Sequence, residues 1–104
     1  RKIIKGHLYS TETAQRVAGF GGDLHDFYED YETLYRTRSG KWFLHGQSSA
    51  GGTYGRSSRG GQELSSGEDI VALTPAGVEE WTTGMRLDDD EATTLAALLD
   101  LSEA

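Results

Sequence analysis

The segment from Tyr31 to His45 constrains the fold more than any other part of the chain. Two stretches in which apolar and polar residues alternate flank Arg38-Ser39-Gly40-Lys41. This pattern is typical of a β-hairpin. A two-residue or four-residue loop would place on one face Tyr31, Thr33, Tyr35, Trp42 and Leu44, and on the other Leu34, Arg36, Phe43 and His45. A three-residue loop would exchange the faces of the second strand; we favour the first arrangement because it gathers the aromatic residues on one side.

The segment before this hairpin predicts a strand, a helix and a loop. Lys2 to Tyr9 alternates loosely and predicts a strand. Ser10-Thr11-Glu12-Thr13 offers hydroxyl N-caps, and Ala14, Val17 and Ala18 recur at helical spacing, which predicts a short helix over about 11–18. The glycine-rich stretch 19–23 predicts a loop.

The segment 46–67 is rich in glycine and serine and has few apolar residues to bury, namely Ala50, Tyr54 and Leu64. We expect it to be a long mobile loop, anchored either by Tyr54 packed back onto the hairpin or by Arg56 and Arg59 paired with carboxylates. The loop is not a phosphate-binding Walker loop, because the Gly-Lys-Ser/Thr end of that motif is missing.

The C-terminal part predicts one strand and two helices. Glu68 to Leu73 predicts a strand, and Thr74-Pro75 marks the start of a helix that ends near Gly84. Asp88, with Glu91 three residues later, marks the start of a second helix that runs to about Leu101.

The predicted order β-α-β-β-β-α-α indicates one α+β domain over residues 1–104, in which helices pack on one face of a small antiparallel sheet. Its apolar runs are too short to span a membrane, and the N-terminus shows no signal-peptide pattern, so we expect a cytoplasmic protein. The chain has no cysteine, which excludes disulfide scaffolds and thiol chemistry.

Charge is unevenly distributed. The chain has 10 basic and 17 acidic residues, and residues 63–104 contain one basic and eleven acidic residues. This balance argues against general affinity for nucleic acid. Three consecutive aspartates exceed what helix capping requires, so an acidic surface that mimics DNA phosphate is the predicted partner-binding site. Its candidate residues are Glu79, Glu80, Asp88, Asp89, Asp90 and Glu91.

The alternative is a nucleic-acid-binding surface formed by the tip of the hairpin and the glycine-rich loop. Arginines could neutralise phosphate there, and a tyrosine could stack on a base. The candidate residues of this surface are Arg36, Arg38, Lys41, Tyr54, Arg56 and Arg59.

Histidine and carboxylate residues give weak signals for a metal site or an enzyme. The three histidines are His7, His25 and His45, with Asp23 and Asp26 near the second. They lack the spacing of a zinc site. His45, Glu32 and Arg36 could form an acid–base triad across the hairpin, but any charged hairpin permits such a set. We therefore expect no catalytic residue, no metal and no cofactor.

Several strings within about residues 9–82 resemble a set of small uncharacterised proteins of bacterial chromosomes, plasmids and phage-like mobile elements. These strings are YSTETA at 9–14, LYRTRSGKWFLHG at 34–46, Tyr54, IVALTP at 70–75 and Glu80-Trp81. The resemblance implies no catalytic residue. It implies an inhibitor of a host defence complex, such as an anti-CRISPR or anti-restriction protein, with a CRISPR effector or restriction complex as partner.

Overall fold

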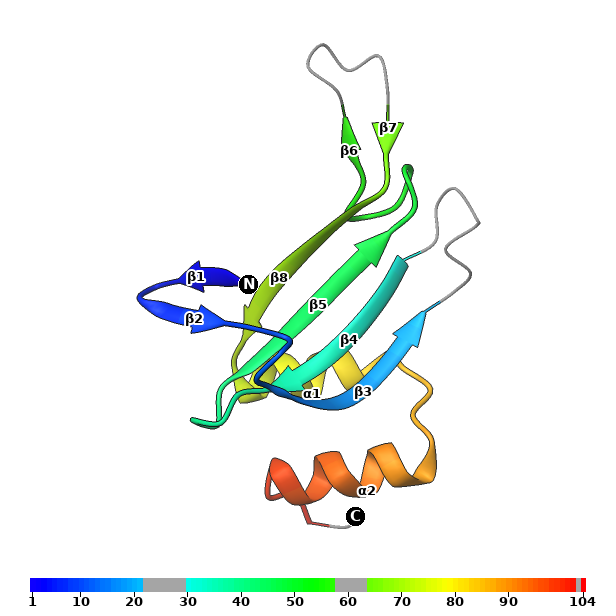
Figure 1. The fold of residues 1–104 in the computed structure, drawn as a ribbon. Helices are drawn as coiled ribbons and strands as arrows, with labels where there is room; N and C mark the ends of the chain where they lie inside the picture. Colours follow the sequence, from blue (N-terminus) through cyan, green and yellow to red (C-terminus); the bar gives the residue numbers. More distant parts are fainter. Residues whose placement is uncertain (22–29, 58–63, 103) are drawn as a thin grey trace.

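The computed structural model describes residues 1–21, 30–57, 64–102 and 104. Its centre is an antiparallel sheet with the strand order β3-β4-β5-β8, formed by β3 (Gln15–Gly21), β4 (Asp30–Arg36), β5 (Trp42–Ser48) and β8 (Gly67–Leu73) (Figure 1). Two helices, α1 (Pro75–Thr83) and α2 (Asp89–Leu98), pack on one face of this sheet. The predicted α+β class, with helices on one face, is therefore confirmed.

The predicted hairpin is present as β4 and β5, and its loop has three residues. The Thr37 N–H donates to the Lys41 carbonyl at 2.8 Å, and the Gly40 N–H donates to the Thr37 carbonyl at 3.0 Å. Arg38, Ser39 and Gly40 therefore form the loop. Gly40 has a φ of 87°, a left-handed value that glycine adopts without steric cost.

The register of this hairpin corrects the faces that we favoured from the sequence. Leu34 lies opposite Leu44, and Tyr35 lies opposite Phe43. Since neighbouring residues of a strand point to opposite faces, Trp42 shares the face of Leu44 and lies away from Tyr35. Gathering the aromatic residues on one side was a wrong criterion because both faces of this sheet are covered, so each needs its own apolar residues.

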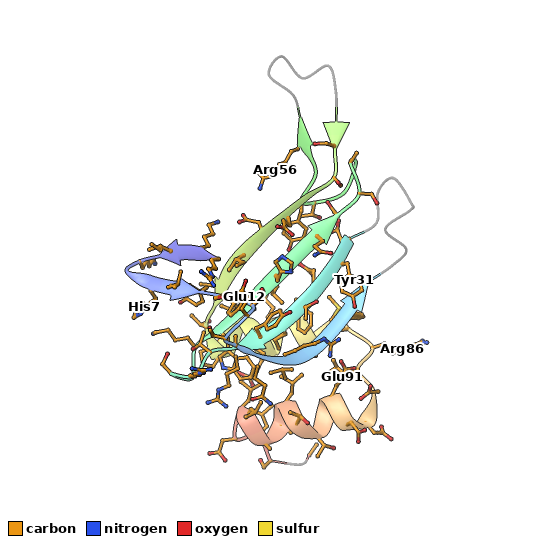
Figure 2. The ribbon with its side chains drawn as sticks, in the orientation of Figure 1. His7, Glu12, Tyr31, Arg56, Arg86 and Glu91 are labelled. Atoms are coloured by element: carbon orange, nitrogen blue, oxygen red, sulfur yellow. The ribbon has the colours of Figure 1, made fainter. Side chains whose placement is uncertain are left out.

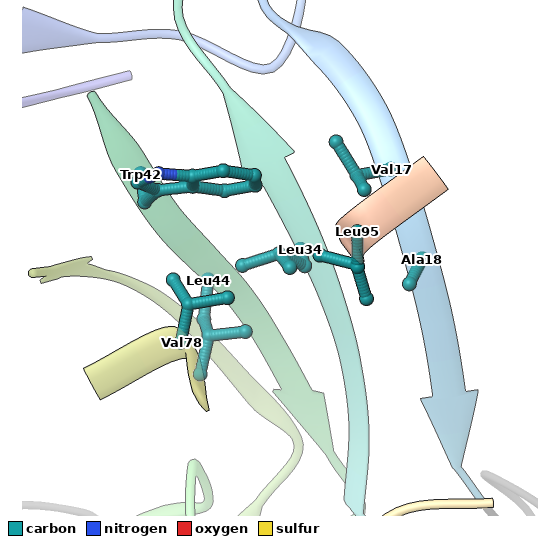
Figure 3. Close-up of a cluster of buried hydrophobic side chains, with 7 residues drawn as sticks. All are labelled: Val17, Ala18, Leu34, Trp42, Leu44, Val78 and Leu95. Carbon is teal, nitrogen blue, oxygen red and sulfur yellow. The ribbon is translucent and has the colours of Figure 1, made fainter. Parts of the chain in front are cut away.

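The larger hydrophobic core lies between the sheet and the two helices (Figure 3). It consists of Val17, Ala18, Leu34, Trp42, Leu44, Val78 and Leu95. Val78 comes from α1 and Leu95 from α2. Burying an aliphatic side chain of this size contributes about 1.5–3 kcal/mol, so these contacts fix both helices on the sheet.

The predicted start and end of α1 are confirmed. The Thr74 Oγ1 accepts a hydrogen bond from the Gly77 N–H at 3.0 Å, and Pro75 is the first residue of the helix. Gly84 is its C-cap. These signals are local, so the sequence alone predicts them.

The helix α2 begins as predicted but ends at Leu98 rather than near Leu101. Asp100 has a φ of 55°, which helical geometry does not allow. The Leu101 N–H donates to the Ala96 carbonyl at 2.8 Å, and the Asp100 N–H donates to the Ala97 carbonyl at 3.2 Å. This is the Schellman pattern, here with an aspartate in the position that glycine usually occupies.

The N-terminal segment is a short hairpin instead of the single predicted strand. β1 (Lys2–Ile4) pairs with β2 (His7–Tyr9) across the two-residue turn at 5–6. Figure 1 shows this hairpin beside β8, near the N-terminus. The β1–β2 hairpin therefore forms its own two-stranded sheet.

A second buried cluster lies on the sheet face opposite the helices. Tyr9, Phe43 and Ile70 are its buried members. The edge of the Tyr9 ring meets Phe43 at 5.5 Å between centroids, and Tyr35 stacks on Phe43 at 5.1 Å. This cluster fastens the N-terminal segment to the sheet.

The predicted helix over 11–18 is wrong. The Ser10 Oγ accepts from the Glu12 N–H at 3.3 Å, and the Ser10 carbonyl accepts from the Ala14 N–H at 3.1 Å. The capping signal is therefore real, but it produces one turn only. From Gln15 the chain becomes β3 and pairs with β4.

A β-bulge in β3 accounts for the spacing that suggested a helix. The register with β4 shifts between Arg16 and Ala18. Because a bulge inserts an extra residue into one strand, Val17 and Ala18 can both face the same core although they are neighbours. The predicted loop at 19–23 is wrong for residues 19–21, which complete β3; residues 22 and 23 lie outside the described part.

The glycine-rich and serine-rich segment 46–67 contains regular structure that the sequence did not predict. β5 continues to Ser48, and β8 begins at Gly67. Between them, β6 (Arg56–Ser57) pairs with β7 (Leu64–Ser65). Residues 58–63 lie outside the described part, so the mobility of this loop stays a prediction.

Candidate functional site

Two of the six predicted partner-binding acids hold α2 in place. The Asp88 Oδ1 accepts from the Glu91 N–H at 2.7 Å, and the Glu91 Oε1 accepts from the Asp88 N–H at 3.2 Å, which forms a capping box. The other carboxylate oxygen of Glu91 accepts from the Gly19 N–H of β3 at 3.2 Å. Asp88 and Glu91 therefore serve the fold.

The other four predicted acids are free of such contacts. Glu79 and Glu80 lie on α1, Asp89 and Asp90 lie in the first turn of α2, and all four are exposed. None of their carboxylates forms an ion pair or a hydrogen bond with any residue that the structure describes. These four residues, the free acids, are exposed carboxylates of α1 and α2 with no counter-charge among the described residues.

Acidic side chains predominate on the two helices and their connection. We call α1, α2 and their connection the helix layer. Arg86 is the only basic residue after position 62, and Figure 2 shows it near the start of α2, pointing outward. On the opposite side of the sheet, Lys2 lies in β1 and Lys5 lies in the turn between β1 and β2. The helix layer therefore carries a net negative charge.

Glu32 of β4 joins the helix layer to the glycine-rich segment. Its Oε1 accepts from the Trp81 Nε1 of α1 at 3.1 Å, and its Oε2 accepts from the Tyr54 hydroxyl at 2.5 Å. The ring of Phe20 meets Trp81 edge-on at 6.1 Å. The sequence does not predict this role, because Glu32, Tyr54 and Trp81 are far apart in the chain and no local pattern connects them.

Tyr54 packs onto the hairpin, which is one of the two anchors that the sequence predicted for the glycine-rich segment. A Cβ at Gly46 would lie 2.0 Å from the Tyr54 ring, so the ring rests directly on the backbone of β5. The Tyr54 N–H donates to the Ser48 Oγ at 2.8 Å. Burial, and then the hydrogen bond to Glu32, hold the pKa of Tyr54 well above its usual value.

The basic residues of the alternative site do not converge. Arg36 lies over the Trp42 ring, 5.2 Å from its centroid, close to the exposed Arg38 and Lys41 of the β4–β5 turn. Arg56 lies at the other end of the sheet and donates to the Glu68 carbonyl at 2.9 Å (Figure 2).

Tyr54 and Arg59 are the remaining residues of the alternative nucleic-acid-binding site. Tyr54 is packed against Gly46 and is therefore unavailable for stacking on a base. Arg59 lies outside the described residues. The described part of the set thus lacks the single basic face, with a free aromatic ring, that nucleic-acid binding requires.

The histidines do not form a site within the described part of the chain. His7 is exposed on β2, and the His45 Nε2 lies 3.3 Å from the Glu68 Oε2. His25 lies outside the described residues, as do Asp23 and Asp26. In the described ranges no three histidine or acidic side chains come together as metal ligands.

The candidate acid–base triad is not assembled. Glu32 and Arg36 lie on the face of β4 that carries the helices, since they contact Trp81 and Trp42. His45 pairs with Thr33, so its side chain lies on the other face. The sheet therefore separates the proposed partners.

Comparison with known proteins gives no relative for this chain: no protein-family model matches it, and neither a curated protein nor a solved structure is similar to it. Among the described residues, neither helix has the length and apolar character that crossing a bilayer demands.

Proposed function

We propose that this protein is a non-enzymatic interaction module. It binds a basic surface of a protein that handles nucleic acid, and it competes with nucleic acid for that surface. The observation that carries the proposal is the set of free acids, Glu79, Glu80, Asp89 and Asp90, which are exposed and have no counter-charge among the described residues.

The rigidity of the helix layer supports this function. Val78 and Leu95 anchor the two helices in the core, and the capping box of Asp88 and Glu91 fixes the start of α2. Carboxylates carried on a fixed scaffold lose little backbone freedom on binding. A negative surface of this kind also attracts a basic groove over long range, as DNA phosphates do.

We propose further that the partner is a host defence complex, such as a CRISPR effector or a restriction complex, and that binding inhibits it. This class of partner is supported only by the resemblance of the YSTETA, LYRTRSGKWFLHG and IVALTP strings to proteins of mobile elements. Charge complementarity with the helix layer does not depend on this resemblance, because any protein with a basic nucleic-acid groove would provide it.

Affinity capture from a bacterial lysate tests the proposal. The bait is the tagged protein, compared with the variant Glu79→Gln/Glu80→Gln/Asp89→Asn/Asp90→Asn, which leaves the capping box intact. The matched control is Arg38→Gln, which alters exposed charge outside the helix layer. The wild type and the control should retain a nucleic-acid-binding partner, and the neutralised variant should lose it. Retention of the same partner by the neutralised variant would refute the proposal.

A further inference from the structure

The outer edge of β8 is unpaired in the described structure. β8 is the last strand in the order β3-β4-β5-β8, so its inner edge pairs with β5. No strand among the described residues pairs with its outer edge. In an antiparallel ladder, alternate residues direct both N–H and C=O away from the neighbouring strand. The outer edge of β8 can therefore form hydrogen bonds with another chain.

Two contacts identify the backbone groups that point outward. The Arg56 Nη2 donates to the Glu68 carbonyl at 2.9 Å, and the Ile70 N–H donates to the Asp69 Oδ1 at 2.8 Å. The backbone N–H and C=O groups of Glu68 and Ile70 thus point away from β5. Those of Ala72, two residues further on, do the same. The Ile70 C=O and both backbone groups of Ala72 remain available in the described structure.

An apolar groove of about 750 Å³ is lined by residues of β8 and of the β1–β2 hairpin. Ile3 and Ile4 line it from the hairpin, and Val71 lines it from β8. The exposed fractions of Ile3 and Val71 are 74% and 40%. An edge strand with exposed β-branched residues is a ready template for strand addition.

The charge of the groove is positive. Lys5, His7 and Lys41 line it, and its one carboxylate, Asp69, pairs with Lys2 at 2.8 Å. Lys5 and Lys41 have no ion-pair partner among the described residues. The groove is therefore complementary to acidic chains, in contrast to the helix layer.

The opposite edge of the sheet is not equivalent. On β3 the outward Gly19 N–H is already bound by the Glu91 Oε2 of α2. Contacts between α2 and β3 occupy that side of the sheet. Of the two outer edges of the four-stranded sheet, the edge of β8 is therefore the accessible one.

The geometry points to a docking site for an extended, apolar segment of a partner protein that is flanked by acidic residues. The segment adds a strand outside β8 and forms hydrogen bonds with the backbone of Ile70 and Ala72. Its apolar side chains contact Ile3 and Val71, and its carboxylates lie near Lys5 and Lys41. This site is separate from the helix layer and does not depend on the proposed function.

Titration of the 15N-labelled protein with two peptides tests this site. Both peptides contain the core Val-Thr-Val-Thr-Val; one is flanked by two glutamates at each end, and the other by two lysines. The glutamate-flanked peptide should shift the amide signals of Ile3, Ile70 and Ala72, and the lysine-flanked peptide should bind about tenfold more weakly or not at all. Failure of the glutamate-flanked peptide to bind at millimolar concentration would overturn the proposal, as would equal binding of both.

Two substitutions of Ala72 distinguish strand addition from nonspecific binding. Ala72→Pro removes an outward N–H and leaves the hydrogen bonds to β5, a position where edge strands tolerate proline. It should weaken peptide binding about tenfold, whereas Ala72→Ser should bind like the wild type. Unchanged affinity of Ala72→Pro would contradict strand addition.

A charge-swapped variant keeps the test decisive if Ala72→Pro disturbs the fold. Lys5→Glu/Lys41→Glu should reverse the preference and favour the lysine-flanked peptide. An unchanged preference would overturn the proposed role of the two lysines. If sedimentation shows a dimer of the free wild type that Ala72→Pro abolishes, the edge belongs to a second copy of the chain and the proposal is wrong.

Discussion

The indole Nε1 of Trp81 donates a hydrogen bond of 3.1 Å to the Oε1 of Glu32, which joins α1 to β4. The Oε2 of the same carboxylate accepts from the Tyr54 hydroxyl at 2.5 Å. One half-buried carboxylate therefore receives two donors from distant parts of the chain. This contact helps to hold α1, which carries Glu79 and Glu80, on the sheet.

Removing this carboxylate should destabilise the protein. Glu32→Ala leaves the Trp81 N–H and the Tyr54 hydroxyl without their acceptor, so the free energy of unfolding should fall by about 1–3 kcal/mol. Urea denaturation measures the change. The control is Glu12→Ala, which removes only an exposed pair with Arg1 and should have almost no effect. Equal losses in the two variants would contradict the role assigned to Glu32.

Gly46→Ala should expel Tyr54 from the hairpin. A Cβ at this position would lie 2.0 Å from the Tyr54 ring, and overpacking of this kind costs about 1–3 kcal/mol. In a Tyr54→Ala background, where the ring is absent, the same substitution should cost much less. A double-mutant cycle measured by urea denaturation checks this coupling. Equal costs in the two backgrounds would show that the ring does not rest on Gly46.

The structure also predicts a loss of stability at alkaline pH. Burial and the hydrogen bond to Glu32 raise the pKa of Tyr54 in the folded protein. Above about pH 10, the usual pKa of tyrosine, the unfolded chain loses this proton before the folded protein does. The stabilisation that comes from the raised pKa of Tyr54 is therefore complete below about pH 10, and the free energy of unfolding falls as the pH rises further. The free energy of unfolding of Tyr54→Phe, measured from pH 8 to 11, should fall less steeply than that of the wild type; identical slopes would contradict the raised pKa.

The features that the sequence predicted correctly depend on local signals. The β4–β5 hairpin follows from alternation around a glycine, and the two helices follow from Thr74 with Pro75 and from Asp88 with Glu91. Each signal acts within a few residues, so neighbouring residues suffice to interpret it.

The features that the sequence missed depend on tertiary contacts. Ser10 begins a helical turn, but pairing with β4 and burial of Val17 and Ala18 convert the next residues into β3. The face assignment failed because one residue of loop length reverses it. The sequence identified Asp88 and Glu91 as the capping pair, but it could not show that Glu91 also binds Gly19, since that contact spans the chain.

Direct binding of nucleic acid should be weak or absent. Arg36, Arg38 and Lys41 lie at one end of the sheet and Arg56 at the other, so no described basic face is large enough to neutralise several phosphates. Gel-shift titrations with single-stranded and double-stranded DNA and RNA at about 50 mM salt, where phosphate contacts are strongest, should show no shift at high micromolar protein. A shift that Arg38→Gln/Lys41→Gln abolishes would favour the alternative function instead.

Competition with DNA tests the central claim most directly. A fluorescent DNA duplex is bound to the partner captured from the lysate, and its anisotropy is followed as the protein is added. The wild type should displace the duplex, less effectively as salt rises, whereas Glu79→Gln/Glu80→Gln/Asp89→Asn/Asp90→Asn should not displace it at the same concentration. Equal displacement by this variant and by the wild type would contradict the account.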